Sequence, residues 1–290
     1  MKIVQILGGL GNQMFQYALA VVLREKFKDE VFIDTTTFKT YPLHNGYELD
    51  KIFNITIQQA KKEQIATLYH HFTESYNMVR IYKHLFPKKK NEFREIEAQP
   101  FNPQIFIDNG NNYYSGYWQD YNYFIKHISA IRKEFEYKTD LYGKNQEYYE
   151  KFVSENYISV HIRKGDYATA KGFGEVCNSD YFKKSISYIK EKISTEAKFA
   201  FFSNDFDWVK KEIVPIIGNN FYVFVDWNTG KDSYNDMRLM SACKTNILSN
   251  SSFSWWAAFL NTNKNPIVIA PQKWNIYQEC RRQLPEWILI

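Results

Sequence analysis

The sequence lacks a long hydrophobic run. None of its 290 residues belongs to an apolar stretch near the roughly 18 residues that suggest a membrane-spanning helix. Met1 and Lys2 lead directly into Ile3–Leu7, a segment too short for the apolar core of a secretory signal peptide. We therefore expect a folded protein with no membrane span and no export signal.

Cysteine is scarce. Cys177, Cys243 and Cys280 are far apart and odd in number. This spacing fits neither a disulfide framework nor a Cys-x-x-Cys metal or redox pair. A reducing cytoplasm is the expected location.

A strong excess of one charge is also missing. The chain has 37 Lys and Arg against 32 Asp and Glu, a net charge of +5. Proteins that bind nucleic acid usually gather basic residues into a stripe, but the run Lys88–Lys90 is followed by Glu92, Glu95 and Glu97. We interpret the run as a solvated loop and expect no nucleic-acid partner. The modest excess suits an anionic small molecule.

The composition is otherwise that of a globular protein with many aromatic residues. Hydrophobic residues make up 44% and charged residues 24%, close to the usual 45–50% and roughly 25%, which excludes wholesale disorder and fibrous architectures. The length fits two medium domains or one large domain. Aromatic residues reach 18%; they mostly fill cores, but Tyr and Trp also line carbohydrate sites.

The first half begins like a parallel β-α-β unit. Residues 2–7 predict a buried strand, and a glycine-rich turn leads into a helix over 12–27, where apolar residues repeat every four positions. Residues 31–33 predict a second strand that ends at Asp34. Residues 40–112 are less regular. Beyond them we predict a strand over 113–117, a helix over 120–135 and a polar connection over 138–156.

The second half alternates strands and helices more regularly, which predicts a five-stranded doubly wound sheet. The predicted strands are 158–162, 199–202, 221–225, 247–248 and 267–270, and the helices lie near 179–194, 206–213, 234–243 and 252–261. We divide the chain into domains 1–150 and 151–290. Ligands of open parallel sheets bind beyond the carboxyl ends of the strands, so the residues after each strand are the candidates for chemistry.

Gly8-Gly9-Leu10-Gly11-Asn12-Gln13 follows the first strand. Glycines let a backbone approach a ligand closely, and a helix N-terminus offers unpaired N–H groups to an anion. The spacing is not the GxGxxG of dinucleotide-binding folds. Two interpretations stay open: a ligand-binding loop, and a tight turn in which Asn12 caps the helix.

His161-Ile162-Arg163-Lys164-Gly165-Asp166-Tyr167 ends the strand 158–162. Alternation along the strand places His161 and Arg163 on one face at the carboxyl edge. A guanidinium can hold a phosphate in a bidentate manner, which lysine cannot. The alternative is a surface ion pair between Arg163 and Asp166 beside a core histidine.

Two further strand ends carry polar residues. Ser203-Asn204-Asp205 follows the strand 199–202, and Asp205-Phe206-Asp207 has the D-x-D pattern with which many nucleotide-sugar enzymes hold a metal ion. We favour helix capping there, because Asp207 would lie in the first turn of a helix. Ser249-Asn250-Ser251-Ser252-Phe253 precedes the last predicted helix and forms a second anion cradle. Two such strand ends predict a diphosphate ligand.

Four segments together resemble the motif set of the α-1,2-fucosyltransferases, glycosyltransferase family 11. They are GGLGNQMFQYA at 8–18, HIRKGDY at 161–167, FFSNDFDW at 201–208 and DMRLMSACKTNILSNSSFSWWAAFL at 236–260. The resemblance implies an α/β fold of GT-B type, with two facing Rossmann-like domains and mostly parallel sheets. It assigns the acceptor to domain 1–150 and GDP-fucose to domain 151–290, with the last helix packing back on the first domain.

The resemblance also implies an activity and a set of site residues. The activity is inverting transfer of fucose from GDP-fucose to a glycan hydroxyl, expected at O2 of a terminal galactose, without a metal or other cofactor. The implied catalytic residues are Arg163, which holds the donor phosphates, Asp166 and Asn12. Implied donor contacts come from Gly11, Gln13, His161, Ser203, Asn204, Asp205, Asp236 (a candidate for guanine), Asn250, Ser251, Ser252 and Phe253. Lys164 and Thr245 depart from the family pattern, which usually has arginine and often histidine there.

The sequence singles out no general base. Asp34, His44 and Glu48 lie in the half expected to bind the acceptor, but each also has a loop or capping explanation. The expected acceptor is a galactose-terminated oligosaccharide or a lipid-linked glycan, and peripheral membrane association stays open. Two other classes stay open as well: a GT-B glycosyltransferase with another nucleotide sugar, and a non-enzymatic nucleotide- or sugar-binding protein.

Overall fold

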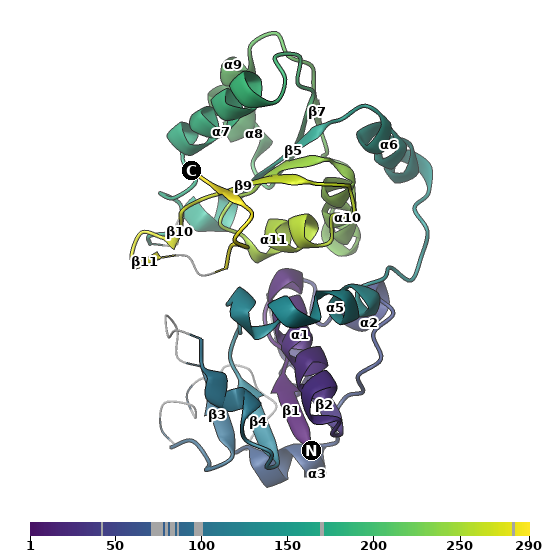
Figure 1. The fold of residues 1–290 in the computed structure, drawn as a ribbon, viewed down its shortest axis with the longest axis vertical. Helices are drawn as coiled ribbons and strands as arrows, with labels where there is room; N and C mark the ends of the chain where they lie inside the picture. The colour runs from purple at the N-terminus through teal and green to yellow at the C-terminus, as the bar shows by residue number, and fades with distance from the viewer. Residues whose placement is uncertain are drawn as a thin grey trace. The chain divides into compact units, whose positions relative to one another are not determined.

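The computed structural model of this chain describes residues 1–41, 43–70, 78, 81, 85, 87–95, 101–168, 171–279 and 282–290. The chain folds into two units, Met1–Thr139 (unit 1) and Asp140–Ile290 (unit 2), each built around its own sheet (Figure 1). The expected boundary after residue 150 falls inside helix α6 (Gly143–Ser154), which belongs to unit 2. The roles assigned to the two domains stay predictions.

Unit 1 contains a four-stranded parallel sheet in the order β2-β1-β4-β3. Its strands are β1 (Lys2–Gln5), β2 (Val31–Asp34), β3 (Glu92–Arg94) and β4 (Asn112–Ser115). Helix α1 (Leu10–Phe27) joins β1 to β2, which confirms the predicted β-α-β opening. The other elements in the described part of unit 1 are η1 (Thr36–Lys39), α2 (Leu49–Ile52), α3 (Lys62–Leu68), η2 (Pro103–Phe106), η3 (Tyr121–Tyr123), η4 (Ile125–His127) and α5 (Ile128–Glu134).

The helix predicted over 120–135 is divided into the short elements η3, η4 and α5. Asp120 begins this segment, because its carboxylate accepts a hydrogen bond from the Asn122 N–H and caps η3. The final part, α5, is fixed to α1 by a buried network in which the Tyr17 hydroxyl and the Arg24 guanidinium donate to Glu134. The prediction of an α-helix is therefore confirmed over α5 only.

Unit 2 contains a six-stranded parallel sheet in the order β12-β9-β8-β5-β6-β7. The five predicted strands are present as β5 (Ile158–Ile162), β6 (Phe199–Ser203), β7 (Tyr222–Phe224), β8 (Thr245–Ile247) and β9 (Ile267–Ala270). The sixth, β12 (Ile288–Leu289), pairs with β9. The last described element of unit 2 is therefore a strand, and the expected packing of the last helix on the first domain stays a prediction.

Helices lie on both sides of the unit 2 sheet, as the doubly wound pattern predicts (Figure 1). They are α7 (Ser179–Lys192), α8 (Phe206–Trp208), the π-helix η6 (Val209–Ile213), α9 (Val214–Ile217), α10 (Tyr234–Ala242) and α11 (Ser252–Phe259). Short 3-10 turns η5 (Gly165–Ala168) and η7 (Gly230–Asp232) and a hairpin of β10 (Lys273–Asn275) and β11 (Gln278–Glu279) complete the unit.

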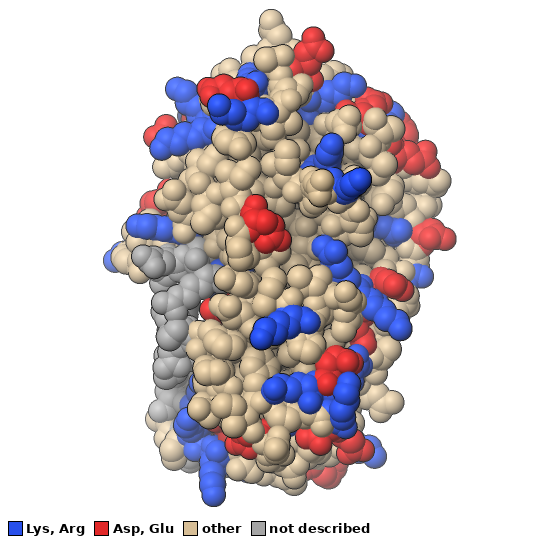
Figure 2. Space-filling view, in the orientation of Figure 1, with Lys and Arg blue, Asp and Glu red and all other residues tan. Residues whose placement is uncertain are grey.

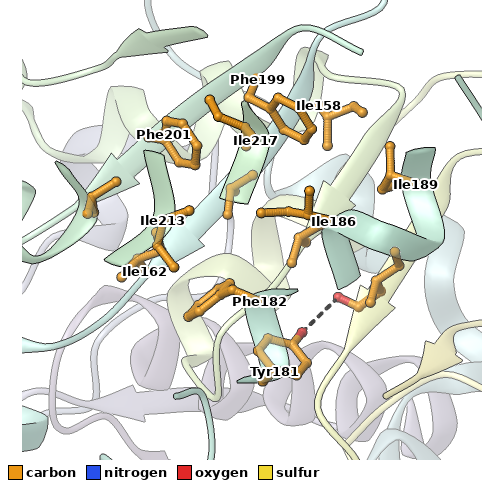
Figure 3. Close-up of a cluster of buried hydrophobic side chains, with 14 of the residues drawn as sticks. Ile158, Ile162, Tyr181, Phe182, Ile186, Ile189, Phe199, Phe201, Ile213 and Ile217 are labelled. Atoms are coloured by element: carbon orange, nitrogen blue, oxygen red, sulfur yellow. Dashed lines mark hydrogen bonds between the residues drawn. The ribbon is translucent and has the colours of Figure 1, made fainter. Parts of the chain in front are cut away.

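The main core of unit 2 lies between α7 and the strands β5 and β6 (Figure 3). Apolar side chains of α7 at Phe182, Ile186 and Ile189 are fully buried against this sheet. The Tyr181 hydroxyl donates to the Leu248 carbonyl at 2.6 Å, which fixes the start of α7 beside the end of β8. This core thus holds the carboxyl ends of β5 and β8 in place.

The structure also bears on the expectations about cysteine, membrane spans and charge. Cys177 and Cys243 are buried free thiols, and Cys280 lies outside the described residues. Within the described ranges, no helix is both long enough and apolar enough to cross a membrane. Lys88–Lys90 lie in a loop and turn before β3, as interpreted. On the face drawn in Figure 2, basic and acidic side chains are interspersed.

Candidate functional site

Three strands of unit 2 end side by side at one edge of the sheet, because β8, β5 and β6 are neighbours in parallel orientation. The segments 163–168, 203–205 and 248–253 follow these strands. The contacts described below bring these segments together, so this edge is one continuous candidate site. Thr245 is the first residue of β8 and lies at the opposite end of that strand.

His161 is a buried, neutral residue of this edge. Its Nδ1 lies 2.7 Å from the Ser249 Oγ, and its ring centroid lies 6.0 Å from that of Phe253. Burial, together with the charge of Arg163, lowers the pKa of His161 to about 3. The imidazole is therefore uncharged at neutral pH and is a weak base. It connects the end of β5 to the loop that precedes α11.

Arg163 and Lys164 point to different surroundings. The Arg163 guanidinium is partly exposed and lies 5.7 Å from the Tyr167 ring centroid. The Lys164 ammonium donates to the Cys177 carbonyl at 2.9 Å and lies 4.2 Å from the Trp208 ring centroid. Burial lowers the pKa of Lys164. The two cations thus have different neighbours, Tyr167 for Arg163 and Cys177 with Trp208 for Lys164. The side chain of Asp166 lies outside the described residues, so its implied catalytic role stays a prediction and its pairing with Arg163 stays the alternative.

Asn204 shapes the backbone that follows Arg163. Its Oδ1 accepts a hydrogen bond from the Lys164 N–H at 2.9 Å. Its amide nitrogen lies over Gly165, where the side chain of Asn204 would have to shift to admit a Cβ. Asn204 thus packs on the backbone of the neighbouring strand end.

Asp205 and Asp207 have ordinary structural roles. Asp205 Oδ1 accepts from the Trp208 N–H at 3.0 Å and caps α8, while the Ser203 Oγ accepts from the Asp205 N–H. Asp207 is 96% exposed and lies 3.4 Å from the Lys210 ammonium. In the described part of the chain, no three His, Cys, Asp or Glu side chains are grouped so that they could hold a metal ion. Metal independence stays a prediction.

The loop before α11 presents hydroxyl and N–H groups. Ser251 caps the helix, since its Oγ accepts from the Phe253 N–H at 3.4 Å. The Ser254 hydroxyl is directed back to the Ser251 carbonyl at 3.3 Å. Ser252 and Phe253 are partly exposed. The first turn of α11 therefore lies beside His161, and the N-terminus of a helix is a place where an anion can be bound.

Asn250 holds this loop in place. Its buried Nδ2 donates to the Phe173 carbonyl at 3.0 Å and the Trp274 carbonyl at 2.8 Å, and its own carbonyl accepts from the Tyr167 hydroxyl. Asn250 thus joins three segments, a role that the sequence analysis missed. Among the described residues, no group donates a hydrogen bond to its buried Oδ1. The expected contact of Asn250 with GDP-fucose stays a prediction.

Asp236 lies in a separate polar network at the start of α10. Asn228 donates to its Oδ1 at 2.8 Å, and Asn145 of α6 pairs with Asn228 and accepts from the Trp227 indole at 2.8 Å. Burial raises the pKa of Asp236 to about 7, although the Asn228 hydrogen bond acts in the opposite direction. The network residues Asn145, Trp227 and Asn228 carry no sequence motif and were not predicted.

In unit 1, Asn12 is not the cap of α1. The helix begins at Leu10, its N-cap is Gly9, and no side chain caps it, so the capping interpretation is wrong. The Asn12 Oδ1 accepts from Gln119 Nε2 at 2.7 Å. Its Nδ2 would lie 2.9 Å from a Cβ on Gly8, which has φ +88°. Asn12 is partly exposed, whereas Gly11 is buried.

Gln13 is fully buried and its amide is used within unit 1. Its Nε2 donates to the carbonyls of Gly8 at 2.9 Å and Gly46 at 2.8 Å, and its Oε1 accepts from the Glu48 N–H. Both N–H groups are therefore occupied. Gln13 joins the segment 46–48 to the glycine turn, so its side-chain N–H groups are not available for the contact with the sugar donor that we expected.

The three acceptor-side candidates have different environments. Asp34 is engaged in the fold, because its carboxylate accepts from the Tyr113 hydroxyl at 2.6 Å and from Thr36. The exposed His44 has φ +58° and lies against Gly9, where a Cβ would be 3.3 Å from its ring. Glu48 is buried, accepts from the Asn45 amide at 3.0 Å, and has a pKa raised by burial. His44 and Glu48 thus lie beside the glycine turn.

The sequence model of the family described as glycosyl transferase family 11 matches residues 1–290. An alpha-1,2-colitosyltransferase of Escherichia coli is 33% identical, covering 99% of this chain and 98% of the relative. The O-antigen biosynthesis glycosyltransferase WbnK of Escherichia coli is 34% identical, covering 92% of each. A galactoside alpha-(1,2)-fucosyltransferase 1 of Mico humeralifer is 21% identical over 97% of this chain and 72% of its own.

Solved fucosyltransferase structures have the same fold. NodZ from Bradyrhizobium gives a TM-score of 0.53 at 14% identity, covering 96% of this chain and 95% of its own. POFUT1 in complex with GDP-fucose gives 0.53 at 11% identity, covering 93% and 97%. Together with the two parallel-sheet units, these neighbours confirm the predicted GT-B fold class.

Proposed function

The chain belongs to glycosyl transferase family 11, and from this premise we propose that it transfers fucose from GDP-fucose to a glycan acceptor, at O2 of a terminal galactose, with inversion and without a metal ion. One observation carries the proposal: Arg163 and the first turn of α11 follow the adjacent strands β5 and β8. The Arg163 guanidinium has N–H donors in a fixed fork, and the start of α11 has backbone N–H donors. Such groups at one edge of a sheet suit a diphosphate.

The leaving group explains why such donors accelerate transfer. As the bond from the sugar to the diphosphate breaks, negative charge grows on the β-phosphate oxygen. Donors already fixed at that place stabilise the transition state more than the ground state. The contacts of Asn250 and of His161 with Ser249 keep the loop 249–253 fixed. In this proposal Arg163 and the α11 amides supply the charge stabilisation that a metal ion supplies in other enzymes.

Asp236 supports recognition of the guanine ring. Guanine presents two neighbouring donors, N1–H and the 2-amino group, which suit one carboxylate. The pKa of about 7 means that burial disfavours the charged carboxylate in this structure. A ligand that donates two hydrogen bonds would favour the ionised form and lower that pKa. Asp236 is therefore our candidate for the nucleotide end of the donor.

Glu48 is our candidate for activating the acceptor hydroxyl. His161 is neutral but has too low a pKa to accept a proton efficiently near pH 7, and Asp34 already accepts hydrogen bonds from Tyr113 and Thr36. Burial raises the pKa of Glu48 toward the range in which a carboxylate is a useful base. The acceptor in this proposal is a galactose-terminated oligosaccharide or lipid-linked glycan, and the reaction takes place in the cytoplasm.

A second candidate donor has a specific observation in its favour. The relative that is 33% identical over 99% of this chain is an alpha-1,2-colitosyltransferase. Colitose is the 3-deoxy analogue of fucose, so a site for either sugar would share the same diphosphate and guanine contacts. The two donors differ only in the C3 hydroxyl, which fucose has and colitose lacks. A site for fucose would therefore need a hydrogen-bond partner for that hydroxyl.

Product analysis with matched donors tests the proposal. Purified protein is incubated with GDP-fucose, GDP-colitose or GDP-mannose and a galactose-terminated oligosaccharide, with and without EDTA, and the product linkage is determined by NMR. We expect an α-1,2-fucosyl product, formed in the same amount with and without EDTA. A product formed only from GDP-colitose would show that the protein transfers colitose instead of fucose. Tight GDP binding without transfer to any galactoside would favour the non-enzymatic class.

A further inference from the structure

A hydrogen bond joins Asn12 to a residue that no motif marks. Gln119 Nε2 donates to the Asn12 Oδ1 at 2.7 Å, although the two residues are 107 positions apart. Asn12 lies in the first turn of α1, and Gln119 lies in the segment 116–120 after β4. Since β1 and β4 are parallel neighbours, both residues lie beyond the carboxyl edge of the unit 1 sheet.

This bond decides which end of the Asn12 amide is directed away from Gln119. A carboxamide has one accepting oxygen and one donating nitrogen. Because the oxygen faces Gln119, the nitrogen faces Gly8, where an added Cβ would lie only 2.9 Å from it. Gly8, with φ +88°, leaves the space above the turn that this NH2 group uses. Reversing the amide would place two donors, Asn12 Nδ2 and Gln119 Nε2, against each other.

The segment that carries Gln119 is itself held firmly. The N–H groups of Tyr117 and Trp118 both donate to Glu95 Oε2, at 2.7 and 2.8 Å. Gln16 of α1 donates to the Gly116 carbonyl at 3.0 Å. Trp118 is 2% exposed and has φ +55°, a conformation that bulky residues rarely adopt. Such conformations persist where the surroundings fix them, and they gather at functional sites.

We propose that Gln119 is a positioning residue, which holds the Asn12 carboxamide so that its NH2 group is presented to the ligand above the glycine turn. The inference rests on the proposed function and adds to it that Asn12, one of the catalytic residues implied by the resemblance, donates to the donor sugar or its phosphate. Gln119 touches no reacting atom in this proposal. It acts only by making one of the two amide orientations unfavourable.

Gln119→Glu is the decisive variant. At neutral pH the new carboxylate can only accept, so Asn12 must turn its NH2 group toward residue 119 and its oxygen toward the ligand. We expect kcat to fall about 100-fold, as for the loss of one preorganised donor, with an unchanged melting temperature. At acidic pH the protonated carboxyl can donate again. The ratio of variant to wild-type kcat should therefore rise several-fold between pH 7.5 and pH 5.

Two variants serve as controls. Gln119→Met keeps the size of the side chain but can neither donate nor accept, so it should lose activity without the recovery at acidic pH. Gln104→Glu adds the same charge at an exposed position of unit 1, and it should behave like wild type throughout. Equal loss in the Met and Glu variants at every pH would overturn the positioning role and leave Gln119 as a packing residue.

A second readout needs no turnover and so separates this inference from the proposed function. In protein labelled with ¹⁵N-asparagine, the Asn12 side-chain amide is assigned by its loss in Asn12→Ala. We expect Gln119→Glu, and not Gln104→Glu, to shift these amide protons downfield, because they then bind a carboxylate. An unchanged Asn12 amide overturns the inference. If the amide shifts but the protein transfers no sugar from any GDP donor, the inferred orientation of Asn12 is supported and the proposed function is wrong.

Discussion

At the scale of single residues, neighbours in sequence can differ completely in what they offer a ligand. Arg163 and Lys164 are consecutive cations, but the Lys164 ammonium donates to the Cys177 carbonyl and lies over the Trp208 ring, whereas the Arg163 guanidinium lies near the Tyr167 ring. We predict that Arg163→Lys lowers kcat with the GDP donor about 100-fold, because the charge remains but the bidentate fork is lost. Lys164→Met keeps the stem packed on Trp208 and should cost less than about 10-fold. Steady-state kinetics measure both, and equal losses would contradict the assignment.

Asn12 allows a second test, because its structural and ligand roles predict different results. It does not cap α1, so Asn12→Asp should not reduce the melting temperature, and an acidic residue in the first helical turn is favourable. The carboxylate still accepts from Gln119 but cannot donate, and it repels a diphosphate. We expect a normal melting temperature with at least about 100-fold lower kcat. Wild-type kinetics would show that Asn12 has no ligand contact.

Sequence reasoning found the residues whose environment depends on local pattern. Strand alternation placed His161 and Arg163 at the sheet edge, and the polar run 249–252 marked the start of α11. It could not find Gln119 or assign Asn250 its role, since their partners lie 107, 77 and 24 residues away. The fold of the whole unit brings such partners together: Asn12 and Gln119 follow parallel neighbouring strands, and Trp274 belongs to the β10–β11 hairpin.

At the scale of elements, a short helix explains the D-x-D pattern without a metal. Asp205 caps α8 and Asp207 is exposed. We predict that Asp205→Asn is nearly neutral for stability and activity, because asparagine caps as well as aspartate, while Asp205→Ala costs about 1 kcal/mol of unfolding free energy. Asp207→Asn should change nothing. Chemical denaturation and transfer assays with EDTA or added Mn²⁺ measure these effects; loss of activity in both Asn variants, with metal dependence, would restore the metal site.

Element boundaries show where periodicity is informative. Long apolar runs gave five strands of unit 2, because buried parallel strands are continuous and apolar. The two-residue β12 is too short to produce a pattern, so the sequence analysis predicted no strand there. The start of α1 was placed two residues late, because Asn is a common cap, whereas here the extended Gly9 begins the helix.

At the scale of the whole molecule, two buried groups of unit 2 make opposite contributions to the pH dependence of stability. His161 has a folded pKa of about 3, below its ordinary 6.5, so the unfolded chain binds the extra proton and stability is lost as pH falls from 6.5 toward 3. Asp236 has a folded pKa of about 7, above its ordinary 3.8, so the folded chain binds the extra proton and stability is lost as pH rises from 3.8 toward 7. Between pH 5 and 6.5 the two slopes oppose each other.

We therefore predict that single variants reveal slopes that wild type conceals. His161→Asn can keep a contact with Ser249 without titrating, and Asp236→Asn can keep the acceptor for Asn228. Relative to wild type, raising the pH from 5 to 7 should destabilise His161→Asn and stabilise Asp236→Asn, each by roughly 1–2 kcal/mol. No contact between the described residues joins the two groups directly, so the double variant should return to the wild-type slope. Urea unfolding at pH 5, 6 and 7 measures this, with His70→Asn in unit 1 as the matched control; parallel slopes in all variants would contradict the buried neutral histidine and the protonated aspartate together.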